Sequence, residues 1–573
     1  MSPRQRRLRA VRWVLLGVFV VGLLGVPAGS VPKDRPALGE GLSLHVSQAV
    51  ALRYWVAHPE QAPAALGAPF AQISEHSSAA LRRRTAKVGR SASAGVLADR
   101  FNADATGLPQ NEESITACRS NTRIVLGSTN DYRGLLDPEG NFTGWHFSNN
   151  GGRSLTNEGL LPSVDGLPSG GDPVTVADDA CHLYAASLAF DPATVPFGAN
   201  GVSVYRSEPG ILASCPGGGS DPTCWPTRRV VAAGTAAPAG GGPNQFLDKE
   251  WLYVGKSGGE TVVWVVFSRF ANDPAAPVGF TGAEIEAVRC NATLSSCTDP
   301  IPISNDPVDG PDVDVQFSDV TVGEDGRTYV TWSEIIGEIP GDPDCQNPDP
   351  DGLCPQVFVH KLRVAEAGST TFGPERVVFV EDRAIPFGGH LHANDFRIAT
   401  VPKNEVAMVG GKPRVFLVWD ACSVLLGTVC EEPVVKLVYS DDFGASWSDP
   451  VKLSKNGDNY FPTISTDRAR SPQRLAVAWF TNRYDRAFHS RQDVEMLTVN
   501  AATVRASGLK RLTARSNDTQ ADPFLGGLFI GDYIEAFTHA GHIWVHYNAN
   551  YRKTLLLGEG VPVNQQDNFL ARR

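Results

Sequence analysis

The chain has 573 residues, of which 42% are hydrophobic and 20% are charged, so it is long and apolar enough to fold around large cores. Its 57 glycines and 41 prolines, with 3 methionines against 26 phenylalanines, favour many tight turns and aromatic strands over long helices. This composition excludes a helical bundle, a fibrous protein and a protein with several membrane spans.

Charge is unevenly distributed along the chain. The first 100 residues carry 14 Lys and Arg against 5 Asp and Glu, so the remaining 473 residues hold 37 basic and 57 acidic side chains. An acidic body of this kind repels phosphate, which argues against a nucleic-acid-binding protein.

The first residues have the three parts of a secretory signal. A basic stretch, MSPRQRRLRAVR, precedes a 14-residue apolar run from Trp13 to Val26, and small residues follow at Ala28 and Ser30. This pattern predicts a signal peptide over residues 1–30 and a secreted or cell-envelope, periplasmic protein with no membrane span after cleavage. An uncleaved N-terminal anchor is the alternative, in which the apolar run spans the membrane with a tilt.

Ten cysteines support export. An even number of cysteines behind a signal peptide is typical of a disulfide set, and the CxxC pairs of a zinc site are absent from the sequence. Eight cysteines form four couples close in sequence, and two remain as a fifth couple. The predicted disulfides are Cys215–Cys224, Cys290–Cys297, Cys345–Cys354, Cys422–Cys430 and Cys118–Cys181.

The texture of the sequence changes near residue 110. Residues 31–110 are rich in Ala, Ser and Arg and are predicted to be a low-complexity or weakly helical spacer or pro-segment. Over residues 111–573, short aliphatic and aromatic runs alternate with Gly, Asp, Asn and Pro, as in strands and turns. Seven similar units begin at Ser114, Gly171, Asp248, Ser318, Asn394, Asn459 and Gly531. Units 57 to 77 residues apart predict an all-β, seven-bladed β-propeller, with six blades as the rival count.

One motif resembles a known family. The stretch SDDFGASW resembles the Asp-box of the bacterial sialidase-like, BNR-repeat propellers, and FSNNGGRSLT is a weaker second copy. The box residues are Ser440, Asp442, Gly444 and Trp447 in the first copy and Ser148, Asn150 and Gly152 in the second. In such a box the carboxylate or amide caps a hairpin turn, glycine supplies a positive φ, and the tryptophan packs beneath the turn. The resemblance covers residues 110–555 and implies a sialidase-like propeller.

The resemblance also implies action on glycans. Sialidases of this family clamp the substrate carboxylate with three arginines and use a tyrosine nucleophile beside a glutamate, with an aspartate as acid and base. The phrase around Arg397, FRIA, is similar to the family phrase that carries the first arginine, although its proline is missing. Arg397 is therefore the predicted substrate clamp, with Arg483 and Arg552 as further candidates. A simple ion pair between Arg397 and Asp395 is the alternative.

Acidic residues at the starts of the innermost strands are expected to meet at the central channel. They are Asp172, Asp248, Asp319, Asp395 and Asp532. Converging carboxylates shift one another's pKa values, which creates the separate acid and base that glycosidases need. Tyr533 and Glu535 are two residues apart and so face one side of a strand. The predicted catalytic residues are Asp172, Asp248, Asp532, Tyr533 and Glu535; capping of strand ends is the alternative for the acidic ones.

The sequence predicts no cofactor and no catalytic metal. An EF-hand starting at Asn347 is rejected because Phe358 stands where a glutamate is needed, whereas the run Asp306, Asp309, Asp312 and Asp314 could hold a structural calcium ion. We predict a monomeric exo-glycosidase that acts on a glycan or glycoprotein. The alternative is a non-catalytic propeller of the cell envelope that binds glycans or proteins.

Overall fold

The computed structural model describes residues 98–573, apart from short segments at 192–193, 195–197, 240, 274, 276–279, 305–312, 338–355, 387–388, 427–428, 523, 526 and 557–561. Strands dominate this part of the chain, and its helices are α5 (Pro209–Ser214), η2 (Tyr132–Leu136) and η3 (Thr519–Ala521). None of these helices is long and apolar enough to cross a membrane. The prediction of an all-β fold is confirmed, whereas the predicted signal peptide lies outside the described residues.

Consecutive strands form antiparallel sheets of four. The first three sheets are β2 (Gln110–Ala117), β3 (Val125–Asp131), β4 (Thr143–Ser148) and β5 (Asn157–Leu160); β6 (Ser169–Ala177), β7 (Leu183–Phe190), β8 (Asn200–Ser207) and β9 (Thr227–Ala233); and β10 (Asn244–Ser257), β11 (Glu260–Asn272), β12 (Phe280–Asn291) and β13 (Ile301–Pro302). The next two are β14 (Val313–Val322), β15 (Thr328–Gly337), β16 (Gln356–Ala365) and β17 (Arg376–Glu381); and β20 (Lys403–Val409), β21 (Lys412–Ala421), β24 (Val434–Ser440) and β25 (Val451–Lys452). The last two are β26 (Asn459–Asp467), β27 (Arg474–Thr481), β28 (Arg491–Asn500) and β29 (Ala506–Arg511), with β30 (Asn517–Asp518) beside β28; and β31 (Glu535–His539), β32 (His542–Ala549), β35 (Asp567–Arg572) and β1 (Ala98–Arg100).

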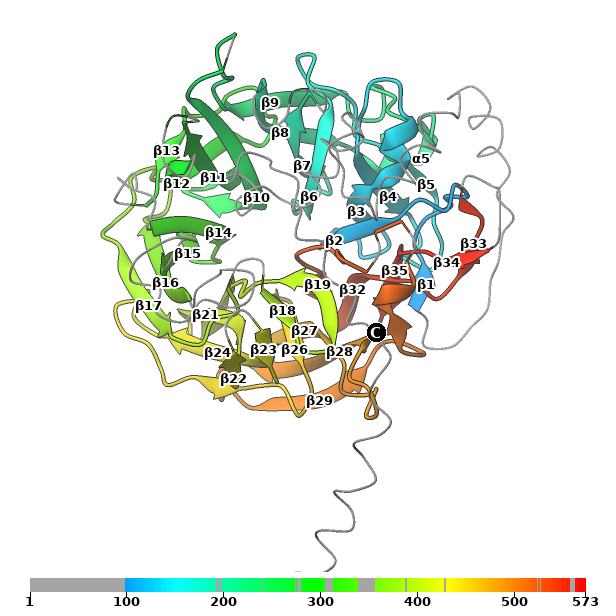
Figure 1. The fold of residues 1–573 in the computed structure, drawn as a ribbon. Helices are drawn as coiled ribbons and strands as arrows, with labels where there is room; N and C mark the ends of the chain where they lie inside the picture. The colour runs from blue at the N-terminus through cyan, green and yellow to red at the C-terminus, as the bar shows by residue number, and fades with distance from the viewer. Residues whose placement is uncertain are drawn as a thin grey trace, which may run out of the picture. The chain divides into compact units, whose positions relative to one another are not determined.

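The first strands of these sheets contact one another in a closed cycle. In chain order β2 contacts β6, and the series continues through β10, β14, β20 and β26 to β31, which contacts β2 again (Figure 1). The final sheet joins both ends of the described chain, because β1 pairs with β35 from Ala98 opposite Ala571 to Arg100 opposite Phe569. The strand β1 lies within the segment predicted to be a spacer, so the sheet region begins before the predicted boundary at residue 110.

A buried tryptophan recurs on the second strand of the sheets. The indoles of Trp264, Trp332, Trp419, Trp479 and Trp544, on β11, β15, β21, β27 and β32, are at most 1% exposed. Each lies in an apolar run such as VVWVVF or VAWF, in which both faces of the strand are covered by neighbouring sheets. Large aromatic side chains at this position account for the repeated aromatic residue in the sequence units, because they fill the space between twisted sheets.

An inserted sheet interrupts the fifth unit. It consists of β18 (Gly389–Leu391), β19 (Asn394–Ile398), β22 (Val424–Leu426) and β23 (Val429–Glu431). The predicted unit start at Asn394 is therefore wrong in place: it belongs to β19 of the insert, and the inner strand of this unit is β20, which begins at Lys403. Phe396 and Ile398 of β19 are fully buried against an apolar cluster that includes Phe461, and this packing fixes the insert over the sheets. A further short pair is β33 (Lys553–Thr554) with β34 (Val563–Asn564).

Four of the predicted disulfides are formed. They are Cys118–Cys181, Cys215–Cys224, Cys290–Cys297 and Cys422–Cys430. The first links the ends of β2 and β6 in neighbouring sheets, and the other three close short loops. Cys345 and Cys354 lie outside the described residues. These bridges are consistent with an oxidising, extracellular compartment.

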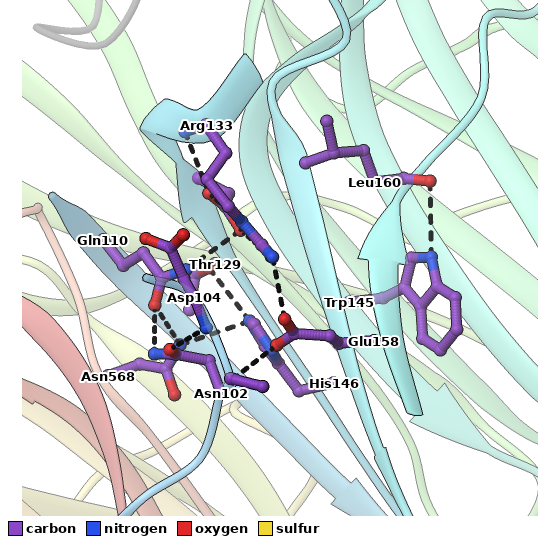
Figure 2. A network of polar contacts seen from close by, with 12 residues as sticks. Asn102, Asp104, Gln110, Thr129, Arg133, Trp145, His146, Glu158, Leu160 and Asn568 are labelled. Atoms are coloured by element: carbon purple, nitrogen blue, oxygen red, sulfur yellow. Dashed lines mark hydrogen bonds and ion pairs between the residues drawn. The ribbon is translucent and has the colours of Figure 1, made fainter. Parts of the chain in front are cut away.

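A buried polar network stabilises the closure between the first and last sheets (Figure 2). Arg133 lies at its centre, with Nε 2.9 Å from the Asp131 carboxylate and Nη1 2.8 Å from Glu158. Burial raises the pKa of Glu158, but the charge of Arg133 outweighs this and lowers the pKa below its ordinary value. Asn568 of β35 connects the network to the C-terminal strand through His146, at 3.2 Å. Charge-assisted hydrogen bonds of Arg133 thus join η2, β3 and β5, and the bond between Asn568 and His146 attaches β35 to them.

Candidate functional site

Five inner strands break register at the same point, one or two residues before their channel-facing part. At each break a non-glycine residue has a positive φ: Glu112 (58°), Asp172 (53°), Lys249 (55°), Phe317 (58°) and Phe461 (49°). A left-handed conformation costs such residues about 1–3 kcal/mol and is found mainly at functional sites. These bulges change the direction of their side chains. The local backbone conformation therefore determines which side chains meet where the strands begin.

Three of these side chains and Asp532 form a buried charged cluster, which we call the Lys249 cluster. Lys249 Nζ lies 2.9 Å from Asp172, 2.6 Å from Asp532 and 3.7 Å from Glu112. Glu112, Asp172 and Lys249 come from three different sheets and Asp532 from the segment before β31, and all four side chains are at most 6% exposed. The predicted convergence of Asp172 and Asp532 is therefore observed, with a lysine between them.

The insert adds an arginine to this cluster. Arg397 on β19 forms a bidentate ion pair with Asp532, one arm of which is the 3.2 Å contact from Nε to Oδ1. Its backbone N–H donates to the carbonyl of Leu528 at 3.2 Å, which holds β19 in place. The alternative partner considered from the sequence, Asp395, lies next to it on β19, but its side chain is outside the described part. Arg397 thus reaches the Lys249 cluster from the insert rather than from an inner strand.

The carboxyl groups around Lys249 have opposite pKa shifts. Burial raises the pKa of Asp532, but the charges of Arg397 and Lys249 outweigh it and leave the pKa below its ordinary value. Burial, reinforced by the charge of Asp172, holds the pKa of Glu112 well above its ordinary value. Burial also raises the pKa of Asp248 to about 8, against the opposing effect of Lys249. At neutral pH the site therefore combines an ionised Asp532 with protonated carboxyl groups.

Two acidic groups beside the cluster have unused hydrogen-bonding capacity. Both carboxyl oxygens of Asp248 and both of Glu250 are buried and have no hydrogen-bond partner among the described residues. Burial, followed by the charge of Asp172, raises the pKa of Glu250 well above its ordinary value. Buried polar atoms without partners are rare in folded proteins and are typical of sites that receive a water molecule or a ligand.

Tyr533 and Glu535 lie together but do not form a nucleophile and base pair. The Tyr533 hydroxyl donates to the carbonyl of Pro173 at 2.9 Å, and burial raises its pKa well above the ordinary value. The Glu535 carboxylate accepts from the Ser114 hydroxyl and from the backbone N–H of Ile115, the latter at 2.8 Å. Nothing in this arrangement lowers the pKa of the tyrosine, so the predicted sialidase-type nucleophile lacks activation.

One cavity, which we call the axial channel, is lined by residues of all seven inner strands, from β2 to β31. Lys403 and Glu535 face it, and the Lys403 ammonium lies 2.8 Å from the centroid of the Trp251 ring. Burial lowers the pKa of Lys403 to about 8 and raises that of Glu535 to about 7. Asp319, another predicted residue, faces the same space and has its pKa raised to about 6 by burial.

The other two predicted arginines lie apart from the Lys249 cluster. Arg483 follows β27 and pairs with Glu495 at 3.3 Å, and its guanidinium lies over the ring of Tyr484. Arg552 is exposed just before β33. The three-arginine clamp expected from the sialidase resemblance is therefore not assembled from Arg397, Arg483 and Arg552.

Sequence reasoning missed the two residues on which the cluster depends most. Lys249 stands between two acidic residues in the phrase DKEW, a pattern that is typical of a solvated side chain. Glu112 was passed over because it precedes the first predicted unit. Consecutive charged residues inside an apolar strand were the available signal, since strands buried on both faces rarely carry them.

The two stretches predicted to be Asp-boxes each form a hydrogen-bonded turn. In the first copy Asp442 accepts from the backbone N–H of Ser446 at 2.9 Å, Gly444 has a φ of 89°, and the Trp447 indole donates to the carbonyl of Gly444 at 3.2 Å. In the second copy Asn150 accepts from the backbone N–H of Ser154 at 3.0 Å. Hydrogen bonds inside the turn use these side chains, which accordingly have a structural role.

The described residues contain no group of three or more His, Cys, Asp or Glu side chains that could hold a metal ion. Asp306, Asp309 and Asp312 of the acidic run lie outside the described part.

No family model matches the sequence, and no curated protein matches it. Solved structures with a similar arrangement include a polysaccharide lyase, the PL25 ulvan lyase, at 8% identity and a TM-score of 0.44, covering 82% of this chain and 95% of that one. The GH93 α-L-arabinofuranosidase of Fusarium graminearum with arabinobiose has 10% identity and a TM-score of 0.38, covering 65% and 88%. A protein of unknown function from Dyadobacter fermentans has 12% identity and a TM-score of 0.40, covering 72% and 97%. The assignment of the site therefore rests on its own geometry.

Proposed function

We propose that this chain is a secreted, sialidase-like, seven-bladed β-propeller that hydrolyses glycosidic bonds, with its reaction centre at the Lys249 cluster. The observation that carries the proposal is the pairing of the buried Asp532 with Lys249 at 2.6 Å and with Arg397 at 3.2 Å. These two charges lower the pKa of Asp532, whereas burial raises the pKa of Asp248 to about 8. Seven four-stranded sheets in a cycle support the propeller, and the four disulfides support secretion.

The two carboxyl groups match the two tasks of a glycosidase. A protonated carboxyl group donates its proton to the leaving oxygen, and an ionised one stabilises the positive charge of the sugar or activates a water molecule. Asp248 is assigned the first task and Asp532 the second. Tyr533 has no part in this chemistry, because its hydroxyl is committed to the carbonyl of Pro173.

Access to the cluster requires a movement of the insert. The Arg397 side chain is 10% exposed and lies on Asp532, so β19 must shift before a sugar reaches the carboxylate. A substrate carboxylate or hydroxyl would then replace Asp532 as a partner of the arginine, which is the role of a substrate clamp.

Turnover of a panel of aryl glycosides, sialosides included, tests the proposal. Asp248→Asn and Asp532→Asn are each expected to lower kcat by about 100-fold or more, the usual contribution of a general acid or base. The exposed Asp179→Asn variant is the matched control and should leave kcat unchanged. Absence of turnover on every glycoside, or equal activity of all three variants, would refute hydrolysis at this site.

Non-catalytic binding of a glycan or protein is the second candidate. It is favoured by the pairing of Asp532 with Arg397 and Lys249 inside the protein, because three hydrogen bonds occupy most of the acceptor positions of this carboxylate. A glycan array with the folded protein separates the candidates: specific retention that survives Asp532→Asn, without turnover, supports binding alone.

A further inference from the structure

A second cavity lies at the opposite end of the axial channel, where the inner strands end. Its lining shares Arg119 and Val254 with the channel, so the two spaces are adjacent. We call this cavity the exit mouth. The residues that define it follow or end inner strands: Arg119 comes after β2, Asp178 after β6, and Arg468 after β26. The Lys249 cluster, by contrast, lies at the bulges where these strands begin.

The acidic residues of the exit mouth are already engaged with other groups. Asp178 lies 2.7 Å from the imidazole of His182, and Asp179 pairs loosely with Lys256 at 3.9 Å. Glu324 accepts from the side-chain amide of Gln473. These contacts partly neutralise the acidic residues of the mouth in the absence of a ligand.

Arg119 has no acidic partner among the described residues, although its side chain shares a hydrogen bond with Tyr253. It forms no ion pair among the described residues, its Nε is buried without a hydrogen-bond partner, and its guanidinium lies over the ring of Phe537 with 5.5 Å between Cζ and the ring centroid. Arg468 lines the same mouth and is more fully engaged: its Nη2 donates to Tyr253 and to the carbonyl of Val322 and lies 3.8 Å from the Glu405 carboxylate, whereas its Nε is buried without a partner. A guanidinium group that is held in place and lacks an acidic partner is pre-organised to pair with an oxyanion.

The disulfide Cys118–Cys181 fixes this arrangement. Cys118 is adjacent to Arg119, and Cys181 follows the acidic pair at 178–179, so the bridge holds both sides of the mouth with 5.2 Å between its Cα atoms. A rigid support of this kind reduces the entropy that would be lost when a ligand binds.

We propose that the exit mouth binds a small oxyanion, the carboxylate or sulfate group of a compact ligand, between Arg119 and Arg468. The ligand oxygens would accept hydrogen bonds from the guanidinium groups at the mouth, and the charge of the ligand would balance Arg119. The site is separate from the Lys249 cluster, so it does not depend on glycan hydrolysis there.

Isothermal titration of the full, disulfide-bonded protein with sodium sulfate, glucuronate and glucose tests this site. The first two probes distinguish a sulfate from a carboxylate, and glucose is the neutral match of glucuronate. We expect saturable binding of at least one anion and no binding of glucose. Arg119→Gln should weaken anion binding about tenfold or more, because it removes the charge that the ligand balances.

Two further variants keep the result interpretable. Arg119→Lys retains the positive charge and should lose less affinity than Arg119→Gln, whereas the exposed Arg153→Gln should bind as the unmodified protein does. Equal unfolding temperatures would show that the Arg119 variants are folded. No saturable binding of sulfate or glucuronate, equal binding of glucose and glucuronate, or unchanged affinity in Arg119→Gln would each overturn the proposal.

Discussion

Replacing Lys249 by methionine tests how strongly the Lys249 cluster depends on its one central cation. Lys249 Nζ contacts Asp172 at 2.9 Å and Asp532 at 2.6 Å, with both carboxylates buried. Removal of one member of a buried ion pair costs about 3–5 kcal/mol, because the remaining charge stays in a poorly solvated place. We therefore expect Lys249→Met to lower the free energy of unfolding in urea by about that amount at pH 7.5.

The loss of unfolding free energy in Lys249→Met should depend on pH. Without Lys249, the buried carboxyl groups have higher pKa values in the folded protein than in the unfolded chain, so the folded protein binds more protons. Stability of the variant, relative to the unmodified protein, should then rise as the pH is lowered from 8 towards 5. Protonation removes the uncompensated charges, and the difference between the two proteins should shrink.

Lys256→Met is the matched control for this experiment. Lys256 is 67% exposed and lies 3.9 Å from Asp179, so its removal should change stability by less than about 1 kcal/mol at any pH between 5 and 8. A loss in Lys249→Met that equals that of the control, or one that stays constant from pH 8 to pH 5, would contradict the assignment of Lys249 as the counter-charge of the cluster.

Three further predictions concern the rest of the fold. Arg133→Gln leaves two buried carboxylates without their cation and should lower the free energy of unfolding by about 3 kcal/mol in a urea titration; a loss below about 1 kcal/mol would mean that the network in Figure 2 contributes little. Burial raises the pKa of Asp420 to about 7, so its contribution to stability is lost as the pH rises through this value, and Asp420→Asn should become more stable relative to the unmodified protein between pH 5 and pH 8. An unchanged difference over this range would exclude the titration of Asp420. Loss of the bridge Cys118–Cys181, which closes 63 residues, should cost about 4 kcal/mol, against about 2 kcal/mol for Cys290–Cys297, which closes 7; the reverse order in parallel serine variants would show that loop length does not govern these bridges.

The strands could be predicted from the sequence because each carries its own local signal. Short apolar runs that end in Gly, Asn or Asp identify strands and turns without long-range information, and the tryptophan on the second strand marks the repeat. Disulfides between cysteines 7 to 9 residues apart followed from loop length alone. The position of Asn394 was wrong because the insert sheet has the same local pattern as an inner strand, and only the pairing of β20 with β21 distinguishes the two.

The composition of the Lys249 cluster could not be predicted, because it is decided by backbone bulges. A strand alternates its side chains, so Glu112 and Lys249 would be assigned to faces that depend on an unbroken register. One extra residue with a positive φ changes that assignment. The sequence gives no sign of this conformation at Glu112 or Lys249, because glycine is the residue that usually adopts it.

The bulges carry different kinds of side chain on the two sides of the cycle of inner strands. Where it holds Glu112, Asp172 and Lys249 the side chains form the charged cluster, and where it holds Phe317 and Phe461 they pack with the apolar core beneath the insert. The bulge is thus repeated in five sheets. Whether a bulge contributes to the apolar core or to the charged cluster depends on the side chain that it carries. The strain of about 1–3 kcal/mol at each bulge is compensated by apolar burial on one side. On the other side the strain is compensated by ion pairs around Lys249. The compensation therefore depends on pH only in the charged half of the cycle.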